Sequence, residues 1–247
     1  MTPNMNELQI RFRDLLDTLC RDYNMTYYFG LGEPEEIYWN WEEFNSAAEH
    51  LGIWCGTGAT KFVIGDENHD YVIKIQPPCL DEKHSEFNYC GREVEVYEAA
   101  VANGFADKFA WTAKLFDYDF GDVILPVYVM ECCQCGYDMI DDEMDDWHYT
   151  KYCTSRKLEK SDDAFCEYCS NRGTNSESER ILEWAYSVWG LDYNGFFEPN
   201  ELTIAQFMRE MRINDIHPGN WGWCNNRLVL VDYSGYGANM DARSLFY

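Results

Sequence analysis

The stretch NDIHPGNWGWCNNRLVLVDYSG, residues 214–235, carries the most structural information in this chain. Two short apolar runs flank Asn225 and Asn226, and paired asparagines at such a position predict the turn of a β-hairpin. Asn220 lies six residues before Asn226 and Asp232 lies six residues after it. In an antiparallel pair these positions lie opposite each other to within about one residue. The sequence therefore predicts that both side chains lie at the open end of the hairpin.

Oxygen ligands gathered at the end of a hairpin suit a hard divalent cation such as Mg²⁺, which also binds phosphates. Asp215 lies on the loop just before the hairpin, close enough to act as a base beside such an ion. His217 is interpreted as a residue that orients this loop. A polar loop closed by Asx turns is the alternative explanation of the same residues.

Upstream of this segment the chain predicts an α+β arrangement with antiparallel strands and no regular βαβ alternation. Gly104 is expected to cap the C-terminus of one helix. No firm periodicity is found from residue 131 to about residue 180. Helices are predicted at residues 5–23, 39–51, 84–103, 177–190 and 200–212. Strands are predicted at residues 52–76 (two strands with a turn at DENHD), 111–119, 123–130 and in the final hairpin.

Three further features lie in the first half of the chain. Gly56 and Gly58 sit at a tight turn, where the backbone can approach phosphates, although a simple strand connection explains them too. Lys74 lies inside an apolar strand, so its ammonium group must reach a partner or solvent. Glu93 borders the apolar stripe of the helix that follows, and we expect it to pair with Lys74. An exposed lysine and a solvated edge carboxylate are the alternatives.

Taken in order along the chain, these residues resemble the protein-kinase signature set. Gly56 and Gly58 match the glycine loop, Lys74 the strand lysine, and Glu93 the helix glutamate nineteen residues later. The matches to the catalytic-loop aspartate and asparagine and to the metal-binding aspartate are Asp215, Asn220 and Asp232. The D-x-H-P-G-N loop is similar to that of the aminoglycoside and choline kinase branch. The short stretch after Asp232 is similar to that of short kinases from some tailed bacteriophages.

The resemblance covers about residues 50–235 and implies a bilobal protein-kinase-like fold with a truncated C-terminal lobe. It implies an N-terminal helical extension at 1–50, a small lobe at 51–132 and a shortened helical large lobe at 133–247. It also implies an ATP- and Mg²⁺-dependent kinase that phosphorylates a hydroxyl acceptor, with protein Ser/Thr favoured. Glycine-loop residues would cover the phosphates and Lys74 would bind them. Asp215 would accept the hydroxyl proton, Asn220 and Asp232 would bind Mg²⁺, and Glu131 and Cys132 would line the adenine site.

Several departures from the kinase pattern keep other functions open. Lys61 replaces the third glycine of the loop, Ile213-Asn214 stands before the catalytic aspartate, and D-F-G becomes Asp232-Tyr233-Ser234. No A-P-E motif follows. A nucleotide-binding pseudokinase or partner-binding module is therefore one alternative, and a small-molecule phosphotransferase is another. Nucleotidyl transfer on the same scaffold is a third.

The composition and net charge of the chain limit the classes of partner that we expect it to bind. Its 247 residues carry a net charge of −25, with a sequence pI near 4.3. Such a field repels nucleic-acid phosphates and attracts basic proteins, so a basic protein is among the expected acceptors. We find no apolar run of membrane-spanning length and no signal-peptide core, and we expect a cytoplasmic protein with no membrane partner.

Eleven cysteines, an odd number, argue against a disulfide scaffold and favour reduced thiols. Cys132 with Cys135 and Cys166 with Cys169 have the spacing of zinc ligands, and His148 or Cys153 are further candidates. A structural Zn²⁺ is kept as the less favoured alternative to free thiols. The acidic run from Asp141 to Asp146 is interpreted as a solvated face, with a docking patch for basic substrates as the alternative.

Overall fold

The computed structural model describes residues 3–23, 54–57, 61–66, 68–76, 88–121, 123–171, 176–193 and 203–235. The fold is mixed α+β with small antiparallel sheets, as the sequence predicted. The chain forms two compact units. The first consists of Met1–Ala99 with Ala110–Cys132, and the second of Ala100–Phe109 with Cys133–Tyr247. The helix predicted at 39–51 and the residue Gly58 lie outside the described residues.

The first unit is built on a five-stranded antiparallel sheet in the order β1-β2-β3-β5-β4. The first three strands are β1 (Trp54–Thr57), β2 (Phe62–Gly65) and β3 (Tyr71–Ile75), and the last two are β4 (Thr112–Asp119) and β5 (Ile124–Glu131). The prediction of two strands within residues 52–76 was wrong. The chain reverses between Thr57 and Phe62, which are register partners, so the first predicted strand is itself a hairpin, in agreement with the tight turn predicted at Gly56 and Gly58.

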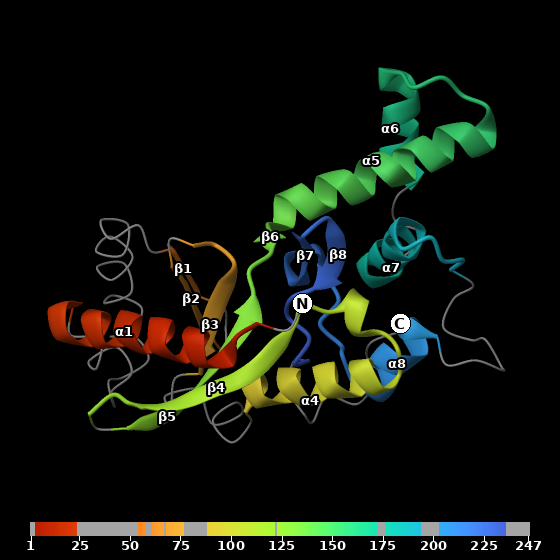
Figure 1. Cartoon of the computed structure of the whole chain (residues 1–247). Coiled ribbons are helices and arrows are strands. Elements are labelled where there is room, and N and C mark those ends of the chain that lie inside the picture. Colours follow the sequence, from red (N-terminus) through yellow and green to blue (C-terminus); the bar gives the residue numbers. More distant parts are fainter. Residues whose placement is uncertain are drawn as a thin grey trace. The chain divides into compact units, whose positions relative to one another are not determined.

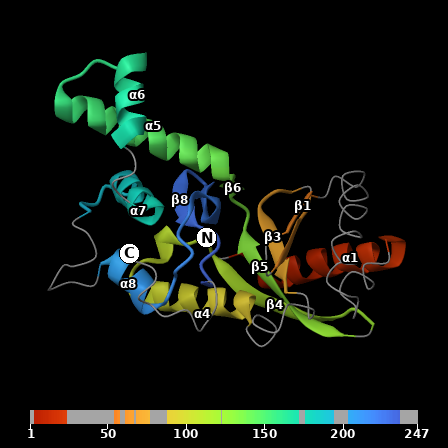
Figure 2. The same ribbon diagram turned by 180° about the vertical axis from the view of Figure 1, so that it is seen from behind.

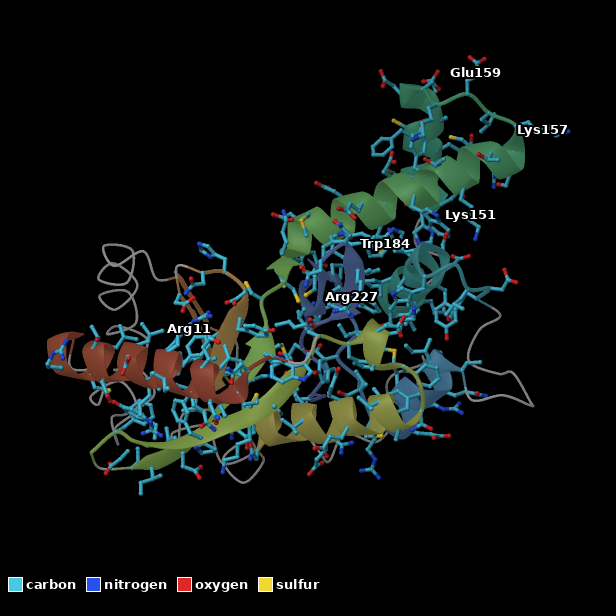
Figure 3. All side chains as sticks on the ribbon, viewed as in Figure 1. Arg11, Lys151, Lys157, Glu159, Trp184 and Arg227 are labelled. Atoms are coloured by element: carbon cyan, nitrogen blue, oxygen red, sulfur yellow. The ribbon has the colours of Figure 1, made fainter. Side chains whose placement is uncertain are left out.

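Helix α1 (Met5–Tyr23) lies against this sheet (Figure 1). Its apolar residues recur every three or four positions and share a core with the strands. The buried members are Leu8, Phe12, Leu16 and Leu19. Arg11, labelled in Figure 3, joins the helix to the sheet: its guanidinium bonds the carboxylates of Asp66, which is buried, and of Asp70.

Helix α4 (Tyr89–Ala102) follows the strand that carries Lys74. It ends as the sequence predicted, because Gly104 adopts a positive φ of 79°. The Phe105 N–H then bonds the Ala100 carbonyl at 2.8 Å, and the Gly104 N–H bonds the Val101 carbonyl at 3.2 Å. This pair of bonds is a Schellman-type helix end, for which glycine is favoured.

The second unit contains two helices that the sequence pattern did not reveal, α5 (Tyr137–Arg156) and α6 (Asp162–Asn171). They form a helical hairpin, seen in Figures 1 and 2, and their connection carries Lys157 and Glu159 (Figure 3). Lys157 ends α5 in the left-handed region, with a φ of 57°. A small cluster of buried side chains holds the two helices together: Tyr149, Cys153, Ala164 and Tyr168.

The remaining elements of the second unit include α7 (Glu177–Val188), α8 (Ile204–Glu210) and the 3₁₀ helices η1 (Ala106–Lys108) and η3 (Pro218–Asn220). They also include a three-stranded sheet of β6 (Gln134–Cys135), β7 (Trp221–Cys224) and β8 (Arg227–Leu230). The predicted hairpin turn is confirmed, since Asn225 and Asn226 have φ angles of 50° and 61°. Helices α7 and α8 confirm the predicted helices near 177–190 and 200–212.

Candidate functional site

In the first unit, Lys74 and Glu93 form the ion pair that the sequence predicted. Lys74 lies on β3, a strand with neighbours on both sides, where it faces Val63 on β2 and Tyr128 on β5. Its Nζ atom is 3.1 Å from both carboxylate oxygens of Glu93 on α4. The lysine is 5% exposed and the glutamate is fully buried. A buried charge is costly unless it is paired, so the two residues depend on each other for their position.

Lys61 joins this ion pair, which the sequence did not lead us to expect. It lies just before β2, is 4% exposed, and places its Nζ atom 2.6 Å from Oε1 of Glu93. This contact is shorter than either contact of Lys74 with the same carboxylate. A lysine beside a predicted turn is typical of an exposed position, so the sequence offered no signal for its burial.

Of the two glycines in the predicted phosphate loop, the structure describes Gly56, through its backbone. It lies in β1 opposite Val63, which is also the β2 partner of Lys74. The strand that begins the predicted loop is thus two strands away from the lysine, in a sheet whose register is continuous. Gly58 belongs to the part of the chain that the structure does not describe.

Glu131 and Cys132, predicted to line an adenine site, close the end of β5. One carboxylate oxygen of Glu131 accepts a hydrogen bond from the Trp111 N–H at 2.8 Å. The Cys132 N–H donates to the Asp70 carbonyl at 2.9 Å. The Cys132 N–H is therefore used in a hydrogen bond next to the end of β5. While this bond persists, the same N–H cannot donate to a nucleobase.

In the second unit, Asp215, Asn220 and Asp232 come together at the open end of the β7–β8 hairpin. The side-chain amide of Asn220 donates to the Asp215 carbonyl at 2.7 Å. The backbone carbonyl of Asn220 accepts from the Val231 N–H at 2.9 Å and lies 3.5 Å from the Asp232 nitrogen. The predicted opposition of Asn220 and Asp232 is therefore correct to within one residue. Because Nδ2 of Asn220 is the donor, its Oδ1 atom faces away from the Asp215 carbonyl and is the atom suited to a cation.

The residues after Asp232 hold its carboxylate and the loop in place. The Ser234 hydroxyl donates to Oδ1 of Asp232 at 3.1 Å, a contact that a glycine at this position could not make. Tyr233 is fully buried, with its ring edge-on to Phe109 at a centroid distance of 5.1 Å. Gly235 follows with a φ of 76°, and a Cβ atom there would lie 2.6 Å from the Arg212 carbonyl oxygen.

His217 lies beside Asp215, with 3.5 Å between its Nε2 atom and Oδ1 of the carboxylate. The imidazole holds the pKa of Asp215 below its ordinary value, against the opposing effects of burial and of the negative charge on Asp232. Asp215 in turn raises the pKa of His217. The Gly219 N–H donates to Nδ1 of the imidazole at 3.1 Å, which leaves the proton of the neutral ring on Nε2, toward Asp215. Asp215 is therefore ionised near neutral pH, as a proton acceptor must be.

Side chains from α7 and α5 contact the loop that carries Asp215 and His217. The Ser178 hydroxyl, in the first turn of α7, donates to the Ile216 carbonyl at 3.0 Å. Tyr137, at the start of α5, places its ring 6.1 Å from that of His217 and donates its hydroxyl to Glu177 at 2.6 Å. The position of Asp215 is thus supported by elements of its own unit.

The residues proposed for zinc do not assemble into a metal site within the described part of the chain, where no group of three or more His, Cys, Asp or Glu side chains is arranged around one point. Cys166 and Cys169 are exposed on α6. Cys153 is buried between α5 and α6, and Nε2 of His148 is 2.9 Å from the Arg180 carbonyl oxygen. The cysteines that the structure describes form no disulfide bonds with one another.

Several side chains of the acidic run on α5 form ion pairs or hydrogen bonds with other residues of their own unit. Asp145 pairs with Arg180, Asp146 with Lys160 at 2.9 Å, and Glu143 accepts from the Trp223 indole at 3.0 Å. These contacts show that the run contributes to the packing of its own unit as well as to its charge.

No protein-family model matches the chain, and no curated protein has a significantly similar sequence. The resemblance to protein kinases therefore depends on the residues described above. None of the helices described is both long enough and apolar enough to cross a membrane.

Proposed function

We propose that the chain is an ATP- and Mg²⁺-dependent kinase with a bilobal protein-kinase-like fold, which transfers the γ-phosphoryl group to a hydroxyl acceptor. The observation that carries this proposal is the meeting of Asp215, Asn220 and Asp232 at one end of the β7–β8 hairpin. The buried pair of Lys74 and Glu93 in the other unit supports it. Together they supply a base, two oxygen ligands and an oriented cation, the groups that phosphoryl transfer uses.

The proposal gives each of these residues a role by its resemblance to the kinase pattern. Lys74, oriented by Glu93, binds the phosphates of ATP. The carboxylate of Asp215 orients the acceptor hydroxyl and takes its proton as the hydroxyl oxygen bonds to the γ-phosphorus, while the bond to the ADP oxygen breaks. The Asn220 Oδ1 atom and the Asp232 carboxylate fit a hard cation, and Ser234 fixes the orientation of that carboxylate. Mg²⁺, when bound, neutralises charge on the phosphates.

The experiment is transfer of label from γ-labelled ATP, with Mg²⁺, to a protein Ser/Thr acceptor such as casein or a basic histone mixture. We expect transfer that falls by about 10²–10⁴-fold in Asp215→Ala, the range for loss of a general base. Asp163→Ala is the matched control, because this aspartate is exposed on α6 and lies outside the acidic run of α5. ATP binding should persist in the Asp215 variant.

The alternatives predict other results in the same assay. ATP-induced thermal stabilisation without transfer would indicate a pseudokinase, and transfer only to small hydroxyl compounds would indicate a small-molecule phosphotransferase. Label from α-labelled ATP on the acceptor would indicate nucleotidyl transfer. If the chain neither binds nor turns over ATP, the proposal is wrong.

A further inference from the structure

Tyr137 connects two helices of the second unit to the loop that carries Asp215. It is the first residue of α5, and its side chain is 46% exposed, so the ring adds less to a core than a buried ring would. Its hydroxyl donates to Oε1 of Glu177 at 2.6 Å. Its ring lies 6.1 Å from that of His217, with 30° between the two ring planes. Tyr137 therefore links the first residue of α7 to the imidazole beside Asp215.

The surroundings of Gly219 show how closely the two rings lie against the loop. A Cβ atom at Gly219 would be 2.9 Å from Cε1 of His217 and 3.6 Å from Cδ2 of Tyr137. The Gly219 N–H also donates to Nδ1 of the imidazole at 3.1 Å. The backbone of Gly219 and the ring of Tyr137 thus restrict the rotation of the imidazole together.

The two helices act on different parts of the loop. The Ser178 hydroxyl of α7 donates to the Ile216 carbonyl at 3.0 Å, so it fixes the backbone. Tyr137 contacts the side chain of His217, whose Nε2 atom is 3.5 Å from Oδ1 of Asp215. Because the Asp215 side chain is 42% exposed, the imidazole is an important restraint on the orientation of its carboxylate. The contact with Tyr137 therefore reaches the carboxylate by way of the imidazole.

We infer that Tyr137 is a positioning residue for the base of the proposed reaction, and that it acts on Asp215 through His217. This inference rests on the proposed function. Tyr137, held by its bond to Glu177, keeps the imidazole in the orientation in which Nε2 faces the carboxylate. A base must lie within about 3 Å of the group whose proton it accepts, so a small displacement of Asp215 slows the transfer step while ATP still binds.

The test measures kcat and KM for transfer from γ-labelled MgATP by the full chain and its variants. We expect Tyr137→Leu, which removes the ring and the hydroxyl, to lower kcat by about 10- to 100-fold, as a displacement of about 1 Å does. Tyr137→Phe keeps the ring and should lower kcat by about two- to tenfold. In both variants KM for MgATP should change by less than about twofold. Tyr152→Phe is the matched control, because it removes a hydroxyl from the same helix where that hydroxyl contacts Asn171 of α6.

A double-mutant cycle with His217 shows whether Tyr137 acts through the imidazole. If it does, Tyr137→Leu should lower kcat much less in the His217→Ala background than in the unmodified chain. Equal factors in the two backgrounds would overturn the inference, because Tyr137 would then act independently of His217. The inference would also be wrong if the loss of kcat only matched the fraction of unfolded protein, measured by circular dichroism at the assay temperature.

A second measurement does not require turnover. The proton NMR signal of Cε1–H in His217, assigned by its absence in His217→Ala, reports the surroundings of the ring. We expect this signal to shift in Tyr137→Leu, because the neighbouring aromatic ring is lost. The signal of His148, whose ring lies beside Trp147, should keep its position. An unchanged His217 signal would contradict the inference.

The outcomes separate this inference from the proposed function. If Tyr137→Leu transfers label as fast as the unmodified chain, Tyr137 is not a positioning residue and the kinase proposal stands. If the unmodified chain transfers no label from MgATP, the proposed function fails, and the role of Tyr137 fails with it.

Discussion

Asp215 and His217 show how two side chains set each other's protonation. Because the pKa of Asp215 is lowered from 3.8, its contribution to stability is present above that pH and is lost as the pH falls through the lowered value. Because the pKa of His217 is raised from 6.5, its contribution is present below that pH and is lost as the pH rises through the raised value. The pair therefore stabilises the loop most in mildly acidic solution.

The prediction is that His217→Ala lowers the free energy of unfolding more at pH 5.5 than at pH 9. The difference should stay below about 1 kcal/mol, because the two side chains are 36% and 42% exposed and solvent screens them. Loss of the Gly219 contact to Nδ1 adds a second effect that does not depend on the charge of the ring. Urea unfolding at the two pH values measures the difference. Asp215→Asn should reduce it but not abolish it, because Glu177 and Asp232 also raise the pKa of His217. Equal losses at both pH values would contradict the pairing.

The backbone after Asp232 offers a second prediction, for the segment that follows the open end of the β7–β8 hairpin. In Gly235→Ala, the new Cβ would meet the Arg212 carbonyl oxygen at 2.6 Å in addition to the cost of a positive φ. Gly190→Ala is the control, since Gly190 has a φ of 70° with no heavy atom within 4 Å of the new Cβ. We expect a loss of about 1 kcal/mol for the control and about 2–4 kcal/mol for Gly235→Ala.

Thermal or denaturant unfolding of the two glycine variants distinguishes these effects. Similar losses in both would show that backbone conformation alone matters at Gly235. They would also show that the backbone near Arg212 can move away from the new Cβ atom with little loss of stability.

The α5–α6 hairpin is an element held by few side chains, so it is expected to open locally. Ala164 is buried in the cluster with Tyr149 and Tyr168. Ala164→Asp would bury a charge there, at a cost of several kcal/mol, and should detach α6 without unfolding the β7–β8 hairpin. Hydrogen exchange over residues 162–171 measures this, with the exposed neighbour Asp163→Ala as control. Unchanged protection of α6 would contradict the role of the cluster.

On the scale of the whole chain, the net charge of −25 dominates the electrostatics. Like charges repel one another in the folded state. At 0.1 M salt this repulsion is largely screened between charges more than about 10 Å apart. We therefore expect the melting temperature to rise by several degrees between 20 and 300 mM NaCl. The same rise with KCl, and none with an equal osmolality of glycerol, would assign the effect to screening. A constant or falling melting temperature would show that local ion pairs outweigh the net repulsion.

The features that the sequence predicted correctly are mainly those that neighbouring residues determine. The Asn225-Asn226 turn, the Gly104 cap and the pattern of α1 are properties of neighbouring residues, and each was predicted correctly. The Lys74–Glu93 pair and the meeting of Asn220 with Asp232 followed from strand and helix geometry.

What the sequence could not predict came from longer-range or weaker signals. Helix α5 buries Ile140, Met144, Tyr149 and Cys153, but the acidic residues between them conceal this stripe. The chain reversal between Thr57 and Phe62 agrees with the tight turn predicted at Gly56 and Gly58, but the residues on either side of it were counted as one strand. The burial of Lys61 depends on Glu93, thirty-two residues away, and no local pattern encodes it.

The bridge from Arg11 to Asp66 and Asp70 has a practical consequence for anyone who shortens this chain. A fragment that starts after Tyr23 would lose a guanidinium that neutralises two aspartates and would expose the apolar side of the sheet that Phe12 and Leu16 cover. The backbone of Asp70 also bonds Cys132, so the damage would extend to the end of β5. Tags and fusion partners are therefore better joined ahead of the first helix than in place of it.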